Sequence, residues 1–76
     1  MKTINKKTID EVLNSGGYVR QEEFGYDTKY ILLDNNKNKI GVIRFNTYLK
    51  LNLIRIKELQ TYHYTYYKLM KEEENV

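Results

Sequence analysis

Residues 60–70 read QTYHYTYYKLM, and they hold four of the eight tyrosines and the only histidine of the chain. This stretch decides the fold, because it determines whether the C-terminal half adds strands to a sheet or forms one long helix. Tyrosine occupies every second position at Tyr62, Tyr64 and Tyr66, which is the side-chain period of a strand. Tyrosine and β-branched residues also favour strands. We therefore predict a strand near residues 61–69.

The region that precedes this strand is compatible with two conformations. A row at helical spacing runs through it, interrupted by Gln60, and comprises Leu49, Leu53, Ile56, His63, Tyr67 and Met70. Apolar residues also alternate with polar ones over residues 49–57, which favours strands. We predict a helical turn near residues 46–52 and a strand near 53–58, with a single helix from about 47 to 72 as the alternative.

A short helix is predicted near residues 8–15. One apolar stripe at helical spacing comprises Ile9, Val12 and Leu13. Thr8 and Glu11 have the spacing of a capping box, in which each side chain bonds the backbone N–H of the other residue. The pair Gly16-Gly17 then supplies a left-handed stop.

The segment between this helix and the C-terminal half is predicted to form strands. Residues 18–24 (YVRQEEF) read as a strand followed by a glycine-containing turn. Residues 30–33 are apolar on both faces, as expected for a central strand. The Asx-rich residues 34–38 form a turn, and residues 39–45 resume a strand, so residues 29–45 make a hairpin.

These elements predict a small α+β domain that comprises residues 1–76. An N-terminal helix packs on an antiparallel sheet of about four to five strands, and the alternative is a helix, a β-hairpin and a long C-terminal helix. Residues 1–7 and 72–76 are expected to be frayed. A chain of this size buries only about 60% of the surface that its unfolded form exposes, so we expect a narrow margin of stability.

Composition excludes several classes of protein. The chain has no cysteine and one histidine, so disulfides and a structural zinc site are excluded, and no cofactor is expected. The N-terminal residues lack the apolar run of a secretory signal, and no window reaches the 18 apolar residues of a membrane span. We therefore expect a cytoplasmic protein without membrane contact.

Lys, Asn, Ile and Tyr together make up 33 of the 76 residues. All four are encoded by AT-rich codons, which indicates a low-GC genome. A small chain without proline or cysteine is typical of the products of phages and mobile elements. If the chain is phage-encoded, the expected location is the cytoplasm of the host cell.

The positive charge is concentrated in the second half of the chain. Residues 35–71 hold eight basic side chains against Glu58 alone, a net charge of +7, whereas residues 9–34 carry a net charge of −4. Cations attract phosphates, and aromatic rings stack on unpaired bases. The predicted binding surface comprises Arg44, Tyr48, Lys50, Arg55, Lys57, Tyr62, His63, Tyr64, Tyr66 and Lys68. In the competing interpretation, the lysines only solvate one face while the tyrosines fill the other.

Patterns that would indicate catalysis or metal binding fail on inspection. The sequence from Asp34 begins like a calcium-binding EF-hand loop, but Lys39 stands where glycine is needed and Phe45 where glutamate is needed. His63 has no orienting partner or activated nucleophile that the sequence identifies. We therefore expect no enzymatic activity.

Two segments near the C-terminus resemble part of a known family. LIRIKEL at residues 53–59 and YTYYKLM at residues 64–70 resemble the end of a winged-helix domain, where a helix precedes a two-stranded wing. The resemblance covers about a third of the chain, and no helix-turn-helix precedes it. We do not infer membership of the family, but the resemblance implies a direct nucleic-acid-binding regulator as an alternative function.

The first functional hypothesis is a non-enzymatic module whose partner is a host protein or nucleoprotein complex, with DNA or RNA as a direct ligand. A phage-type inhibitor of host nucleic-acid-handling machinery, in the manner of anti-defence or anti-CRISPR proteins, fits this size and composition. The second hypothesis is a purely protein-binding subunit that docks through its tyrosines, because tyrosine is well suited to interfaces. The sequence leaves the oligomeric state open.

Overall fold

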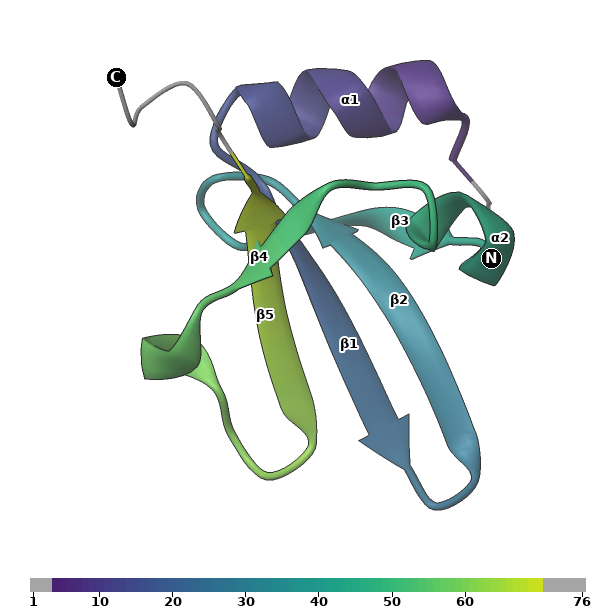
Figure 1. The fold of residues 1–76 in the computed structure, drawn as a ribbon, viewed down its shortest axis with the longest axis vertical. Helices are drawn as coiled ribbons and strands as arrows, with labels where there is room; N and C mark the ends of the chain where they lie inside the picture. The colour runs from purple at the N-terminus through teal and green to yellow at the C-terminus, as the bar shows by residue number, and fades with distance from the viewer. Residues whose placement is uncertain (1–3, 71–76) are drawn as a thin grey trace.

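Helix α1 (Lys6–Asn14) packs against a five-stranded antiparallel sheet in the computed structural model, which describes residues 4–70 (Figure 1). The strands are β1 (Tyr18–Phe24), β2 (Asp27–Leu33), β3 (Lys39–Ile43), β4 (Leu53–Arg55) and β5 (Tyr64–Leu69). The helical turn α2 (Phe45–Tyr48) and the 3-10 turn η1 (Lys57–Leu59) lie on either side of β4 in the sequence. The predicted α+β class is therefore confirmed, and the sheet has five strands, within the predicted range of four to five.

The strands are arranged in the order β3-β2-β1-β5-β4. Strand β1 pairs with β2 through a tight turn, and its other edge pairs with β5, which lies more than forty residues later in the chain. The alternative of one helix over residues 47–72 is wrong, because β4 and β5 lie within that range. The period-two placement of tyrosine and β-branched side chains outweighs the helical row.

Two predicted strands near the C-terminus are longer than the observed ones. The strand near residues 53–58 ends at Arg55 and is followed by η1, and the strand near 61–69 begins at Tyr64. The single turn α2 precedes β4, so residues 4–70 contain no helix-turn-helix before the β4–β5 pair. The likeness to a winged-helix domain is thus limited to this pair of strands.

The cap of α1 differs from the predicted capping box. Asn5 is the N-cap, and its side chain accepts a hydrogen bond of 2.9 Å from the backbone N–H of Thr8. Asparagine is a stronger N-cap than threonine, so the helix begins before Thr8. Of the termini expected to be frayed, Lys6 and Lys7 are in α1, while residues 1–3 and 72–76 lie outside the described residues.

The glycine pair after α1 ends the helix as predicted. Gly16 has φ +96° and donates to Leu13, and Gly17 donates to Val12 at 2.9 Å, so both orphan carbonyls are satisfied. At Gly17 a Cβ atom would lie 2.5 Å from the carbonyl oxygen of Leu33. The chain therefore needs glycine at this position in order to pass between α1 and β2.

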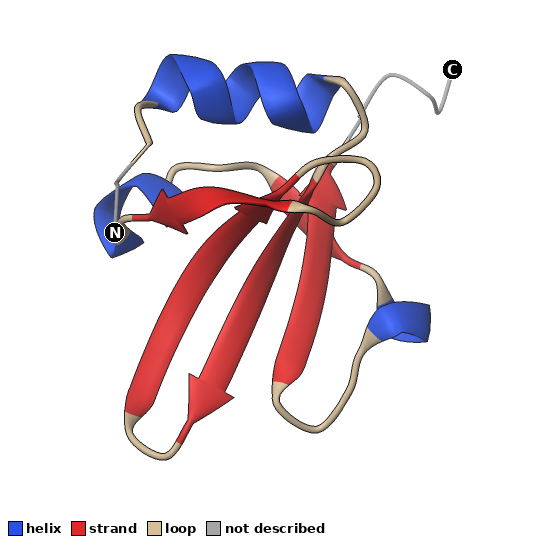
Figure 2. Ribbon diagram, turned by 180° about the vertical axis from the view of Figure 1, so that it is seen from behind, coloured by secondary structure: helices blue, strands red, loops and turns tan. Residues whose placement is uncertain are grey.

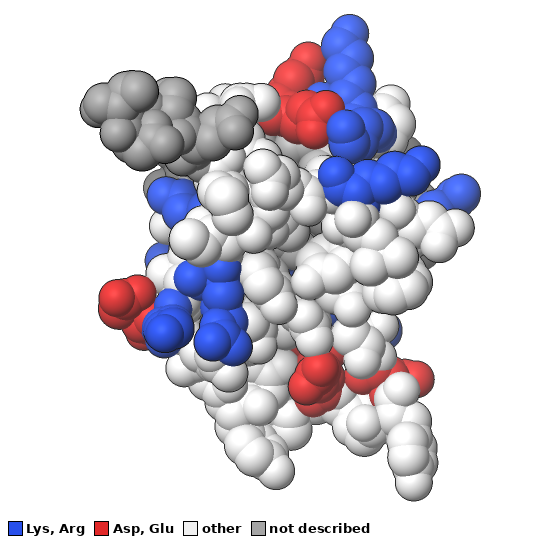
Figure 3. All heavy atoms as spheres, in the orientation of Figure 1, with Lys and Arg blue, Asp and Glu red and all other residues white. Residues whose placement is uncertain are grey.

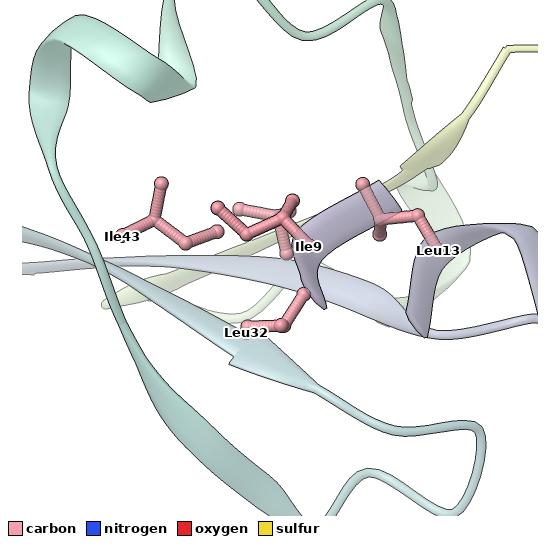
Figure 4. Packing of buried hydrophobic residues seen from close by; sticks show 5 residues of the cluster. Ile9, Leu13, Leu32 and Ile43 are labelled. Carbon is pink, nitrogen blue, oxygen red and sulfur yellow. The ribbon is translucent and has the colours of Figure 1, made fainter. Parts of the chain in front are cut away.

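The main core cluster lies between α1 and one face of the sheet, while Ile31 and Leu33 of β2 are buried on the other face. Ile9 and Leu13 of α1 contact Val19, Leu32 and Ile43 from β1, β2 and β3, and each of these side chains is at most 2% exposed. Figure 4 shows the side chains of Ile9, Leu13, Leu32 and Ile43 lying close together. Their burial supplies the main stabilising free energy of a domain that has no disulfide.

Helix α1 lies across one end of the long strands and leaves the other end uncovered (Figures 1 and 2). The end of the β1–β2 hairpin, residues 23–29, is exposed throughout. In residues 4–70 there is no helix of sufficient length and hydropathy to cross a bilayer.

Replacement of Gly17 by alanine is expected to destabilise the fold by about 1–3 kcal/mol or more, because the added methyl group must displace backbone atoms. Gly25→Ala is the control. Its φ of +64° is unfavourable for alanine by about 1–2 kcal/mol, but no atom lies within 4 Å of the added methyl group. Urea denaturation measures both, and a smaller loss for Gly17→Ala would contradict the packing described.

Candidate functional site

The two faces of the sheet differ in what covers them. Residues directly opposite each other on antiparallel strands share a face, so Val19 and its partner Tyr67 lie on the side of α1. The next pair, Arg20 and Tyr66, points to the other side. We call this second side of β1 and β5 the open face; it comprises Tyr18, Arg20, Glu22, Tyr64, Tyr66 and Lys68. No helix lies in front of β1 and β5 in the view of Figure 2.

Aromatic rings form a continuous row along the open face. Tyr66 lies 6.5 Å from Tyr18 and 6.4 Å from Tyr64 between ring centroids, and its ring is perpendicular to both. Phe24 extends the row beyond Tyr64 at 6.0 Å. Edge-to-face contacts of this kind are favourable, so neighbouring rings hold one another in fixed orientations.

Three cationic side chains contact this row. The Arg20 guanidinium lies 4.6 Å from the centre of the Tyr64 ring, and the Lys37 and Lys68 ammonium groups lie 5.1 and 5.2 Å from that of Tyr18. All three distances are within the range of cation–π attraction. The open face therefore combines aromatic surface with positive charge.

Arg20 is held in place by a carboxylate on the same strand. Its Nη2 atom lies 2.6 Å from Glu22 Oε2, and its Nε–H donates to the same oxygen at 2.8 Å. Burial alone would lower the pKa of Arg20, but hydrogen bonds to Tyr66 and Glu22 raise it above its usual value. The guanidinium therefore stays charged, and Glu22 neutralises much of its field.

Lys37 reaches the open face from the turn between β2 and β3. The Asp34 carboxylate accepts hydrogen bonds from the backbone N–H groups of Asn36 and Asn38 at 2.9 and 2.8 Å. These hydrogen bonds hold the pKa of Asp34 below its usual value, and the one from the backbone N–H of Asn38 contributes most. The turn was predicted from its Asx residues, but the left-handed conformation falls on Lys37, with φ +66°.

The exposed end of the β1–β2 hairpin is tied to the loop before β5. The Glu23 N–H donates to the His63 carbonyl at 2.9 Å, and His63 Nδ1 lies 2.8 Å from the Glu23 carbonyl oxygen. Because a carbonyl only accepts, Nδ1 carries the proton and Nε2 is the acceptor of the neutral ring. Phe24 stacks on this ring at 4.3 Å, which joins the two loops.

We call these two loops the distal tip; it comprises Glu23, Phe24, Tyr26, Asp27, Tyr62 and His63. Tyr26 is fully exposed and Tyr62 is 94% exposed. Glu23, Gly25, Tyr62 and His63 line an open hollow of about 280 Å³. Figure 3 shows acidic side chains gathered at this end of the molecule. The tip is thus aromatic and acidic.

The predicted binding surface is divided among several parts of the molecule. Tyr64, Tyr66 and Lys68 share the open face, and Tyr62 and His63 lie at the distal tip. The other five predicted residues lie elsewhere in the molecule. Arg44 and Tyr48 belong to the start and end of α2, Lys50 follows it, Arg55 pairs with Tyr67 toward the side of α1, and Lys57 is in η1.

Alternation and the crossing of the chain explain this division. Successive residues of a strand point to opposite faces, so Tyr66 and Tyr67 separate. The segment from α2 to β4 passes on the side of α1, where Leu51 packs on the core. On that side, Figure 3 shows basic side chains in separate groups near β4 and near α2.

Four residues of the site were missed, namely Tyr18, Arg20 and Phe24 from β1 and Lys37 from the turn after β2. The alternation of YVRQEEF places Tyr18, Arg20 and Phe24 on one face, and this signal was available in the sequence. Their position beside Tyr64 and Tyr66 depends on the pairing of β1 with β5, which no local pattern indicates.

Tyr48 is partly buried against the core. Its ring stacks on Tyr30 at 3.9 Å and meets Tyr67 at 6.0 Å. Burial raises the pKa of the Tyr48 phenol, and a hydrogen bond to the Tyr67 hydroxyl adds to this effect. The Tyr67 hydroxyl in turn donates to Gln21 at 3.1 Å. These contacts attach α2 to the sheet.

Residues 4–70 contain no cluster of three or more His, Cys, Asp or Glu side chains that could hold a metal ion. Comparison of the chain with protein-family models, with curated proteins and with solved structures returned no match. The geometry of the site is therefore the basis for any functional inference.

Alkaline pH is expected to destabilise the protein through Tyr48. The folded state keeps this phenol neutral, whereas an unfolded tyrosine ionises near pH 10. The stabilisation is therefore complete below about pH 10 and is lost as the pH rises above it. Urea midpoints measured from pH 8 to 11 should fall less steeply for Tyr48→Phe than for the wild type. Tyr26→Phe, at a fully exposed position, is the control and should follow the wild type. Equal slopes for all three proteins would contradict the partial burial of the Tyr48 hydroxyl.

Proposed function

We propose that this chain is a non-enzymatic binding module that holds single-stranded nucleic acid against its open face. The observation that carries the proposal is the row formed by Tyr18, Tyr66 and Tyr64 together with the ammonium groups of Lys37 and Lys68. Aromatic rings that stack on bases beside cations that attract phosphates are the usual means of binding a strand without sequence preference.

The spacing of the rings favours an unpaired strand over a duplex. Adjacent ring centroids lie 6.5 and 6.4 Å apart, nearly twice the rise of about 3.4 Å per nucleotide along one strand of B-form DNA. Stacked neighbouring bases therefore do not match neighbouring rings. A strand that follows the row must be unstacked, and unstacking costs less for a base that is already unpaired.

The ring orientations also support a binding role. The rings of Tyr18 and Tyr64 each meet the Tyr66 ring at 88°. The Arg20 guanidinium lies over the Tyr64 ring and helps to hold it in place. Side chains that are already ordered lose little rotamer entropy when a ligand binds. Each of these rings keeps part of its surface in solvent, which a base can cover.

The surroundings of His63 support a non-enzymatic role. Its Nδ1 is hydrogen-bonded to the Glu23 backbone carbonyl, which is a contact between two loops. Its ring neighbours are Phe24 and Tyr62, whose side chains are not nucleophiles activated by a base. The packing of His63 thus serves to join two loops.

The composition supports a cellular setting for this role. The lysine-, asparagine-, isoleucine- and tyrosine-rich chain is of the kind that phages and mobile elements encode. In that setting the module would act in the host cytoplasm, and it would modulate a nucleoprotein machine by occupying an exposed strand.

The open face should bind single-stranded oligonucleotides with an affinity that falls steeply as salt rises. Tyr66→Leu removes the central ring and keeps an apolar side chain, so we expect affinity to fall about 5- to 150-fold, equivalent to the 1–3 kcal/mol of one base–aromatic stack. Tyr26→Leu at the distal tip is the matched control and should bind like the wild type. Fluorescence anisotropy measures all three proteins. No salt-sensitive binding by the wild type, or an equal loss for both variants, would rule the proposal out.

A second candidate function is protein docking through the distal tip. Tyrosine is enriched among the residues that contribute most to protein–protein binding. Tyr26 and Tyr62 are almost completely exposed. Their acidic neighbours Glu23 and Asp27 would repel phosphates. The tip therefore fits a protein with an apolar pocket surrounded by lysine or arginine.

Nuclease treatment separates the two candidates. If the distal tip docks on a protein, a partner captured from a lysate should remain bound after nuclease digestion. Replacement of both Tyr26 and Tyr62 by serine should then abolish capture, whereas Tyr66→Leu should not affect it. Capture that disappears with nuclease, or that depends on Tyr66 alone, would contradict docking through the tip.

A further inference from the structure

Lys37 and Lys68 converge on one ring from separate parts of the sequence. Their ammonium groups lie 5.1 and 5.2 Å from the centre of the Tyr18 ring. Lys37 belongs to the turn after β2, and Lys68 is on β5. Within residues 4–70 the ion pairs are Lys6–Asp10 and Arg20–Glu22, so neither of these two lysines is neutralised there. We call Lys37, Tyr18 and Lys68 the lysine clamp.

The backbone at Lys37 is strained in a way that the sequence could have avoided. A residue with a Cβ atom is unfavourable at positive φ, and asparagine tolerates this conformation better than lysine. The turn contains three asparagines, Asn35, Asn36 and Asn38, yet the residue at φ +66° is Lys37. Conformations of this kind persist where the surrounding structure holds them, and they cluster at ligand sites. Here the turn sets the Lys37 ammonium group at the Tyr18 ring, where it could meet a ligand.

The position of the clamp on the open face indicates what that ligand is. Tyr18 is the last ring of the aromatic row, and the row continues from it in one direction only, toward Tyr66 and Tyr64. A phosphate group at the clamp would therefore lie at the end of a strand bound along the row. A terminal phosphate is a monoester with a charge of about −1.5 to −2 near pH 7, which matches two ammonium groups better than the single charge of an internal phosphate.

We propose that the lysine clamp binds the terminal phosphate of a single-stranded nucleic acid whose bases lie along Tyr66 and Tyr64. This inference rests on the proposed function, because the aromatic row must hold the rest of the strand. Each ammonium group would donate charge-assisted hydrogen bonds to phosphate oxygens, and both lysine side chains contact the Tyr18 ring. The module then recognises strand ends rather than the interior of a strand.

Three oligonucleotides of one sequence test the proposal, carrying a 5′-phosphate, a 3′-phosphate or neither. We expect one phosphorylated form to bind the wild type at least about tenfold more tightly than the unphosphorylated form. Equal binding of all three would overturn the clamp while leaving the proposed function intact. No binding of any of them would overturn both.

Lys37→Asn separates a binding role from a structural one. Asparagine tolerates the left-handed conformation, so this variant should be at least as stable as the wild type in urea and yet lose the preference for the phosphorylated strand. Lys68→Gln should lose the same preference. The double variant Lys50→Gln and Arg55→Gln removes more charge away from the open face and should retain it. Retention of the preference by Lys37→Asn would overturn the proposal.

Inorganic phosphate distinguishes a strand end from a free anion. It should shift the NMR signals of the Tyr18 ring only weakly, and it should compete with the phosphorylated oligonucleotide only at a large excess, because it lacks bases for Tyr66 and Tyr64. Tight binding of inorganic phosphate without any preference among the oligonucleotides would assign the clamp to a free anion and contradict the proposal.

Discussion

The antiparallel pairing of β5 with β1 is the constraint on which the other features of this domain depend. It brings residues 64–67 beside residues 19–22, so that β1 is paired on both edges and Val19 is buried in the core. The same pairing sets Tyr66 and Tyr64 beside Tyr18 and Arg20 on the opposite face. One set of backbone hydrogen bonds therefore both stabilises the fold and assembles the candidate site from two distant segments.

The two faces of β5 divide the tyrosines by role. Tyr67 points toward α1, where it contacts Tyr48 and Gln21 and attaches α2 to the sheet. Tyr66, the next residue, points to the open face and contacts Tyr18. Since a shift of one residue in register would exchange these two sets, the contacts of Tyr67 on the side of α1 also fix which tyrosines reach the open face. Core packing and the geometry of the site are thus coupled through a single strand.

The sequence predicted the elements better than their assembly. Period-two tyrosines identified β5, the glycine pair ended α1, and the Asx-rich turn located the β2–β3 hairpin. Asn5 was missed as the cap because Thr8 also fits a known motif. Only part of the site was predicted. Charge counted along the chain does not show that Arg55 and Lys68 point to opposite sides of a sheet. Tyr18 and Lys37 enter the site through long-range pairing and a strained turn, which local patterns do not report.

The most direct test of this account is where a bound strand touches the protein. Single-stranded DNA that carries 5-bromouracil can be crosslinked to nearby aromatic rings by ultraviolet light, and mass spectrometry then identifies the modified residues. Adducts on Tyr18, Tyr64 or Tyr66 are the predicted result, because these rings line the open face. Adducts confined to Tyr26 and Tyr62 at the distal tip, or the absence of any adduct at saturating protein, would contradict it.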